Sequence, residues 1–249
     1  MGRTSRTWVG LANYAVLLRQ GHFWAATWVS GKFFMAYLIF NMVIAYVLAI
    51  VLVRLKPWFC GAMLSLYRVP GIISAISAVA VWRWFYRYEG GMFNSILERF
   101  HLPRALWLGD PKLAIWAICL VMMGATVGGS MLLYSAALGQ VNREIVEAAK
   151  LDGANELQLI WYIFTPLTQP MRLYILLGNL IGAMQIWEHP FFFTHGGPLG
   201  STKTMMYEIF EIAFTKHDFG LASAMTVATV AIAFLVAILF MRKLKVYVH

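Results

Sequence analysis

Three uncharged, largely apolar runs divide this sequence, and each is long enough to cross a lipid bilayer. They cover residues 33–53, 113–138 and 219–241, and none of them contains Asp, Glu, Lys, Arg or His. A transmembrane helix needs roughly 20 such residues to cross the hydrocarbon core. We therefore expect each run to form a transmembrane α-helix.

Composition and two shorter apolar runs extend this interpretation to five spans. With 61% hydrophobic and 12% charged residues in a chain of 249, an ordinary soluble domain is excluded. Residues 69–82 and 173–187 are shorter than a full span, but shortened spans occur where a helix faces a cavity or another helix. The expected fold is an all-α, polytopic membrane bundle of about five transmembrane helices.

A polar, helix-forming insert, here called the elbow, lies between two long apolar segments at residues 139–170. Asn142 can cap a first helix, and Gly153 is expected to break it. A second helix is expected from four apolar residues at helical spacing, and Pro166 forbids its continuation; the four are Leu157, Ile160, Trp161 and Phe164. Two short helices joined at a glycine make a compact site that another protein can bind.

From Glu147 to Pro166 the elbow reads EAAKLDGANELQLIWYIFTP. This resembles the EAA loop of the inner-membrane permease subunits of bacterial ABC importers, the components of binding-protein-dependent transport systems. Their pattern is Glu-Ala-Ala, three residues, Gly, nine residues and Ile-x-Leu-Pro, and Thr165 replaces the usual Leu. Other segments resemble sugar-type permeases, so that the similarity covers nearly the whole chain; they are residues 9–18, 69–94, 194–202 and 219–224.

The resemblance implies a type I importer permease in the bacterial inner membrane, with the elbow as a cytoplasmic coupling loop. It implies that the elbow docks on a cytoplasmic ATPase, with Glu147 in polar contact and Gly153 permitting the turn. ATPase coupling is assigned to Glu147, Ala148, Ala149, Asp152, Gly153 and Pro166. The implied partners are a second permease subunit, a dimer of ATP-binding subunits, an extracytoplasmic solute-binding protein and membrane lipid. The implied cargo is a sugar or a related polyol or oligosaccharide.

The sequence lacks the motifs that ATP binding and proton-coupled transport require, and it offers only a weak candidate for a metal site. There is no G-x-x-x-x-G-K-[ST] phosphate loop, so ATP and Mg are expected on partner subunits, with no cofactor and no enzymatic activity here. The three long runs lack the ionisable groups that proton-coupled carriers need. A metal site at Glu188, His189 and His195 is a weaker interpretation than an interfacial loop, because a further convergent ligand is missing.

The substrate path is assigned to Asn179, Gln185 and Trp187, which lie in or beside the run at 173–187. Buried amides are costly in lipid, so they point into the bundle or a wet cavity, where they can bind hydroxyl groups. Interhelical packing is an equal alternative for Asn179, because Gly178 and Gly182 form a small-x-x-x-small pair. Gly124 and Gly128 form a second such pair, for which close packing is the better interpretation. Asn41 is expected to form an interhelical hydrogen bond rather than to bind cargo.

Charge does not orient the bundle, because Lys and Arg are spread almost evenly over its two sides. The resemblance places the elbow in the cytoplasm, together with a purely basic loop at 54–68.

Residues 1–32 are expected to form an interfacial segment ahead of a permease domain at 33–249. Family members usually have a further span ahead of the segment at residues 9–18. Either that span is missing from the sequence as given, or this member of the family lacks it. The net charge of +9 is spread over six segments, which favours lipid headgroups over nucleic acid.

Two alternatives stay open at the level of sequence. One is an ABC permease for a different cargo, such as glycerol phosphate. The other is a membrane scaffold that transports nothing.

Overall fold

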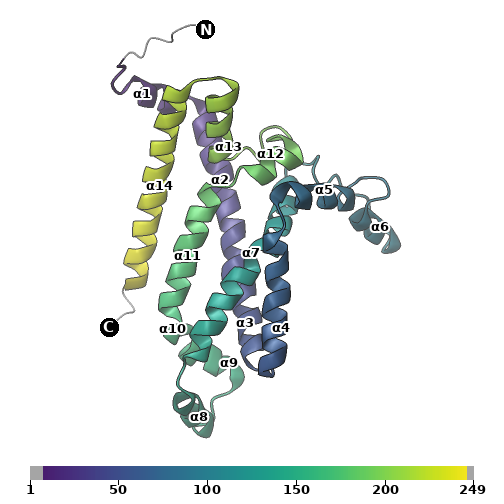
Figure 1. Ribbon diagram of the computed structural model, residues 1–249, viewed down its shortest axis with the longest axis vertical. Helices are drawn as coiled ribbons and strands as arrows, with labels where there is room; N and C mark the ends of the chain where they lie inside the picture. The colour runs from purple at the N-terminus through teal and green to yellow at the C-terminus, as the bar shows by residue number, and fades with distance from the viewer. Residues whose placement is uncertain (1–7, 246–249) are drawn as a thin grey trace.

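The computed structural model describes residues 8–245; residues 1–7 of the expected interfacial segment and 246–249 of the expected permease domain lie outside this range. Within it every regular element is helical, which confirms the all-α prediction. Long helical segments, here called legs, run along the long axis of the molecule in alternating directions (Figure 1). The first leg consists of α2 (Gly21–Ile39), the π-helical turn η1 (Phe40–Ile44) and α3 (Ala45–Val53); the others are α4 (Pro57–Arg68), α7 (Ala114–Gly139), α11 (Gln169–Met184) and α14 (Phe219–Lys245).

Shorter elements lie at the two ends of these legs (Figure 1). One end carries the elbow, with α8 (Arg143–Leu151), α9 (Glu156–Leu159), the π-helical turn η3 (Ile160–Phe164) and α10 (Thr165–Leu167). The opposite end carries α1 (Ala12–Arg19), α5 (Ala75–Phe85), α6 (Met92–Arg99), α12 (Glu188–Thr194), α13 (Met205–Phe210) and the π-helical turn η4 (Glu211–Thr215). The legs therefore separate the elbow from the connections around α12 and α13.

The three long apolar runs are confirmed as helices long and apolar enough to cross a membrane; they are Gly21–Val53, Ala114–Gly139 and Phe219–Arg242. The first begins at Gly21 rather than residue 33, because the helix continues through Lys32. The Lys32 ammonium lies 5.6 Å from the ring centroid of Trp28. The shorter leg α11 has 16 residues, or about 24 Å of helix, and one face of it is buried against its neighbours.

The prediction of a basic loop at 54–68 is wrong, because residues 57–68 are helical, and residues 69–82 belong to a bent pair of helices rather than to one straight span. α4 and the 3₁₀ turn η2 (Val69–Ile72) form a leg beside α7, and the chain then bends by 95° into α5 (Figure 1). Pro70 lies in this turn, and Ile73 is extended. The hydroxyl of Ser74 accepts a hydrogen bond from the N–H of Ser77 at 3.3 Å, so that α5 begins as a separate helix.

Glycine lets α4 and η2 lie directly against α7. A Cβ atom on Gly128 would lie 2.2 Å from the carbonyl oxygen of Tyr67, and one on Gly71 would lie 2.7 Å from that of Ala125. Small residues permit such close backbone approach between membrane helices. Close packing at Gly128 is therefore confirmed, whereas Gly124, the other member of the predicted pair, faces open space.

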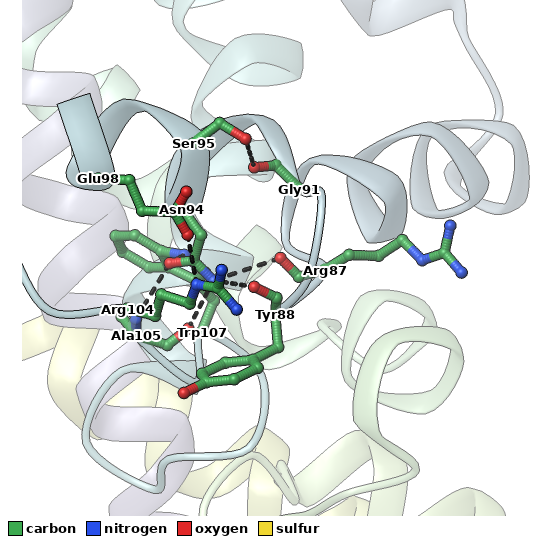
Figure 2. A network of polar contacts seen from close by, with 9 residues as sticks. All are labelled: Arg87, Tyr88, Gly91, Asn94, Ser95, Glu98, Arg104, Ala105 and Trp107. Atoms are coloured by element: carbon green, nitrogen blue, oxygen red, sulfur yellow. Dashed lines mark hydrogen bonds and ion pairs between the residues drawn. The ribbon is translucent and has the colours of Figure 1, made fainter.

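Asn94 holds together the loop that connects α5 to α7 at the opposite end. Its amide nitrogen donates to the carbonyls of Arg87, Tyr88 and Ala105 at 3.1–3.3 Å (Figure 2). Its amide oxygen accepts from the N–H of Ala105 at 3.0 Å and from the indole N–H of Trp107 at 3.1 Å. One buried side chain therefore satisfies polar groups from three parts of the loop.

Replacing Asn94 by leucine is expected to lower the free energy of unfolding of this loop by about 3 kcal/mol, because the N–H groups of Ala105 and Trp107 lose their acceptor. The measurement is thermal unfolding in detergent combined with limited proteolysis between residues 86 and 113. Ser95→Ala is the control, since it removes only one hydrogen bond, to the carbonyl of Gly91. Equal protease resistance in Asn94→Leu and in the unmodified chain would contradict the assigned role.

Candidate functional site

Local signals in the sequence build the elbow. The side chain of Asn142 accepts a hydrogen bond from the N–H of Glu144 at 2.9 Å, which confirms it as the cap of α8. Gly153 ends the first helix with a φ of +86°, a conformation that other residues rarely adopt. Asn155 and Gln158 then form a capping box that starts α9, with hydrogen bonds of 2.9 and 2.7 Å. The two-helix elbow joined at Gly153 is therefore confirmed.

The second helix of the elbow continues slightly further than predicted. α9 widens into the π-helical turn η3, and α10 includes Pro166 before the helix ends at Leu167. Proline has no N–H to donate, so it interrupts the regular hydrogen-bond ladder. Thr168 then leaves the helical conformation, and α11 begins at Gln169. The elbow is thus joined to the leg α11 through a single turn.

Two contacts join the elbow to the first leg. The Nη2 atom of Arg54, next to the end of α3, lies 2.6 Å from Oε2 of Glu156 at the start of α9. The hydroxyls of Tyr46 and Thr165 lie 3.2 Å apart. The exposed ion pair contributes at most about 1 kcal/mol to stability. Its position matters more than its strength, because it connects the elbow to a leg distant in sequence.

The outer surface of the elbow carries most of the predicted coupling residues. Glu147, Ala148, Asp152 and Gly153 are exposed, and Leu151 between them is 88% exposed. Ala149, Asp152 and Gly153 line a hollow of about 310 Å³ together with Gln158, Tyr162 and Ile163. Pro166 is also exposed, but it does not line this hollow. The structure thus gathers three of the six predicted residues around one concave surface.

A second concave feature, the mid-bundle cavity, has a volume of about 410 Å³ and lies among α2, α4, α7 and α11. Its polar lining consists of Tyr37, Arg68, Thr126, Ser130, Tyr174 and Asn179. Thr126 and Ser130 lie at the middle of α7, which places the cavity midway along the bundle. Asn179 is 7% exposed, and its Nδ2 atom has no hydrogen-bond acceptor among residues 8–245.

Asn41 organises one wall of the mid-bundle cavity. Its Nδ2 atom donates to Thr126 Oγ1 at 3.2 Å and to the carbonyl of Tyr37 at 3.1 Å, and its Oδ1 atom accepts from Ser130 Oγ at 3.2 Å. The side chain is completely buried. The predicted interhelical hydrogen bond of Asn41 is therefore confirmed. The alternative of close packing at Gly178 is wrong, because this residue lines the cavity and a Cβ atom there would meet no neighbour.

Gln185 and Trp187 lie apart from Asn179. Gln185 follows the last residue of α11 and is exposed, and the ring of Trp187 stacks on Phe210 with centroids 4.6 Å apart. Neither residue lines the mid-bundle cavity. The three residues predicted as one substrate path therefore occupy two places, one midway along the bundle and one at its opposite end.

A compact ion cluster lies near Trp187 at the opposite end. Lys203 Nζ lies 2.7 Å from Glu208 Oε2 and 2.8 Å from Glu211 Oε2, and Lys216 Nζ lies 3.8 Å from Glu208 Oε1. Burial lowers the pKa of Lys203, but hydrogen bonds and the charges of Glu208 and Glu211 outweigh it, so the pKa is raised. The cluster neutralises Glu208, which is only 3% exposed.

The interpretation of His189 and His195 as metal ligands gains no support. No group of three or more His, Cys, Asp or Glu side chains in the part of the chain that the structure describes is arranged to hold a metal ion. Burial lowers the pKa of His189, which favours its neutral form. His195 instead adopts a positive φ of 49° at the end of α12.

Sequence reasoning missed Arg68 and the cavity wall on α7. The sequence analysis places Arg68 in a loop, because a charged residue usually marks the end of a membrane span. The available signal was the length of the uncharged segments on both sides, because residues 57–82 contain Arg68 as their single charged residue. Thr126 and Ser130 gave no signal, since hydroxyl side chains are common within transmembrane helices and can bond to their own backbone.

Comparisons with known proteins agree with this architecture. A family model described as binding-protein-dependent transport system inner membrane component matches residues 11–244. The sulfoquinovosyl glycerol transport system permease protein SmoG of Agrobacterium fabrum is 28% identical over 95% of this chain and 77% of its own. The trehalose/maltose transport system permease protein MalF of Thermococcus litoralis is 27% identical over 95% of this chain and 80% of its own.

A solved structure has the same fold. The crystal structure of a bacterial ABC transporter for the import of the acidic polysaccharide alginate contains a chain that superposes with a TM-score of 0.86. The two chains are 18% identical, and the match covers 98% of this chain and 86% of the other.

Proposed function

The chain belongs to the family of binding-protein-dependent transport system inner membrane components, and on that premise we propose that it imports a sugar or a related polyol or oligosaccharide. It is the permease subunit of an ABC importer and not itself an enzyme, since separate subunits of such importers hydrolyse ATP. The names of two relatives, which concern a sulfoquinovosyl glycerol and trehalose or maltose, support carbohydrate as the cargo class.

The observation that carries the proposal is the exposed elbow, which projects from one end of the bundle and is joined to two membrane legs (Figure 1). We assign Glu147, Ala148, Ala149, Asp152, Gly153 and Pro166 to docking on an ATPase subunit. The side chain of Glu147 has no ion pair or hydrogen bond with other residues of the 8–245 range, so it is free to meet a partner.

Docking at the elbow has a direct mechanical route to the mid-bundle cavity. α10 passes movement of the elbow to α11, which carries Asn179. Arg54 and Tyr46 pass it to the first leg, which carries Tyr37. Closure of an ATPase dimer that holds ATP and Mg would therefore shift two walls of the cavity together, and the population of access states would follow the nucleotide.

The remaining partners in this proposal are a second permease subunit and an extracytoplasmic solute-binding protein. The elbow then faces the cytoplasm, and the connections around α12 and α13 face the solute-binding protein. Asn179 lies on the cargo path within the membrane, and Gln185 and Trp187 lie at its entrance. This arrangement explains why the predicted path residues occupy two levels of the bundle.

Cysteine labelling tests the orientation. Leu151 at the elbow is 88% exposed and Leu199 at the opposite end is 96% exposed, so each is replaced by cysteine in a Cys60→Ser, Cys119→Ala background. A membrane-impermeant maleimide applied to intact spheroplasts is expected to label Leu199→Cys alone, and to label Leu151→Cys only after lysis. Labelling of Leu151→Cys in intact spheroplasts would place the elbow outside and overturn the proposal.

Reconstituted uptake tests the function itself. The chain is assembled with its second permease, ATPase subunits and solute-binding protein in proteoliposomes, and accumulation of labelled carbohydrate is measured with and without ATP. ATP-dependent accumulation that is lost when this chain is omitted is the expected result. A scaffold, in contrast, would leave accumulation unchanged when the chain is omitted.

A further inference from the structure

We propose that Arg68 makes the mid-bundle cavity a binding site for an anionic group of the cargo, so that the importer takes a sugar or polyol bearing a carboxylate, sulfonate or phosphate. This inference rests on the proposed function and narrows its substrate class. It is carried by a charged side chain that lines this open cavity midway along the bundle and is itself exposed.

The first step is the position of Arg68 along the bundle. It is the last residue of α4, and it lines the cavity beside Thr126 and Ser130 at the middle of α7. Asn179 of α11 and Tyr37 of the first leg close the same cavity. A guanidinium near the middle of a membrane bundle is expensive, and such residues usually face a water-filled path and serve binding or transport.

The second step is the absence of an anion to neutralise Arg68. Among the residues that line the cavity there is no Asp or Glu. Within the described range 8–245, the guanidinium makes no ion pair or hydrogen bond. Arginine has up to five N–H donors arranged to bind an oxyanion through two parallel hydrogen bonds. The cavity therefore offers a donor set without a protein acceptor.

The third step is that the backbone around Arg68 is fixed. A Cβ atom on Gly128 would lie 2.2 Å from the carbonyl oxygen of Tyr67 and 3.2 Å from the backbone nitrogen of Arg68. On the other side of Arg68, the backbone of Gly71 lies against that of Ala125. α4 is thus held against α7 immediately before and after Arg68, which keeps the guanidinium at the cavity.

The fourth step is that the rest of the lining suits hydroxyl groups. The Nδ2 atom of Asn179 is a buried donor without an acceptor in residues 8–245. Ser130 donates its proton to Asn41, so its hydroxyl oxygen can still accept hydrogen bonds, whereas the Thr126 oxygen already accepts one from Asn41. The volume of about 410 Å³ lies within the range of small-molecule sites. A polyhydroxylated molecule with one acidic group matches this set.

The test compares acidic cargoes with their neutral counterparts in the assembled importer in proteoliposomes. The pairs are glucuronate and sulfoquinovose against glucose, sulfoquinovosyl glycerol against glucosyl glycerol, and glycerol 3-phosphate against glycerol. We expect ATP-dependent uptake of at least one acidic compound and none of its neutral counterpart. Arg68→Met is expected to reduce that uptake about tenfold or more, and Arg68→Lys less. Arg83→Met, which removes an exposed charge outside the cavity, is the matched control.

ATPase activity stimulated by the solute-binding protein is measured in parallel, and its retention shows that Arg68→Met is folded and assembled. Uptake of the acidic compound by Arg68→Met at the unmodified rate would overturn the anion site. Uptake of a neutral sugar in preference to its acidic counterpart would also overturn it, while leaving the sugar permease intact. No uptake of any compound, acidic or neutral, would overturn the proposed function as well.

Discussion

Replacing Glu147 by lysine is expected to reduce ATP-dependent uptake about tenfold or more, although the chain still folds and enters the membrane. The side chain is exposed on α8 and has no partner within residues 8–245, so its removal costs the isolated chain little. A lysine there would face Arg143 and Lys150 one turn away, which destabilises the helix by only about 0.5 kcal/mol. Reversal of a charge at a protein interface costs several kcal/mol in contrast.

The measurement is uptake and ATPase activity of the assembled importer, together with the amount of ATPase retained on the purified permease. Glu89→Lys, a charge reversal on an exposed residue at the opposite end of the bundle, is the matched control. It is expected to keep the ATPase bound. Full uptake with normal ATPase retention in Glu147→Lys would remove Glu147 from the coupling surface.

Replacing Gly128 by valine is expected to destabilise the bundle by about 3 kcal/mol or more. The new side chain would overlap the carbonyl of Tyr67, a backbone atom that moves only if all of α4 moves. Separation of α4 from α7 would also widen the mid-bundle cavity, so transport is expected to fail together with stability.

Thermal unfolding in detergent measures this effect. Gly124→Val is the matched control, since Gly124 lies one turn away on α7 and a Cβ atom there meets no other atom within 4 Å. The control is expected to unfold at nearly the temperature of the unmodified chain. Equal unfolding temperatures for both variants would mean that contact between α4 and α7 contributes little.

The elbow and the long spans were predictable because their signals are local. An uncharged run of sufficient length predicts a membrane helix, and Asn142, Gly153 and Pro166 each restrict the backbone at their own position. The sequence therefore yields the order of elements and the position of the bend within the elbow. It places the end of the second helix at Thr165, two residues too early, because Pro166 lies in the first turn of α10, where proline is tolerated.

The cavity was only partly predictable because it depends on contacts between distant segments. Asn179 stands out in sequence as an amide in an apolar run, but its relation to Arg68 depends on α4 lying against α7. Gln185 is close to Asn179 in sequence, but it lies beyond the last residue of α11 and not at the cavity. The rule that a charge ends a span failed at Arg68, because it describes helices surrounded by lipid rather than helices beside a cavity.

The sharp bend after η2 has a consequence for how a charge is tolerated midway along the bundle. Arg68 ends α4, and the helical segment itself ends one 3₁₀ turn later at Ile72, where the last carbonyl groups of a helix carry partial negative charge. In a straight helix through residues 57–85 the same guanidinium would lie at mid-helix, far from such a terminus. The bend thus places the carbonyl groups of a helix end near Arg68. Their partial negative charge, rather than a carboxylate, stabilises the guanidinium when no anionic cargo is bound.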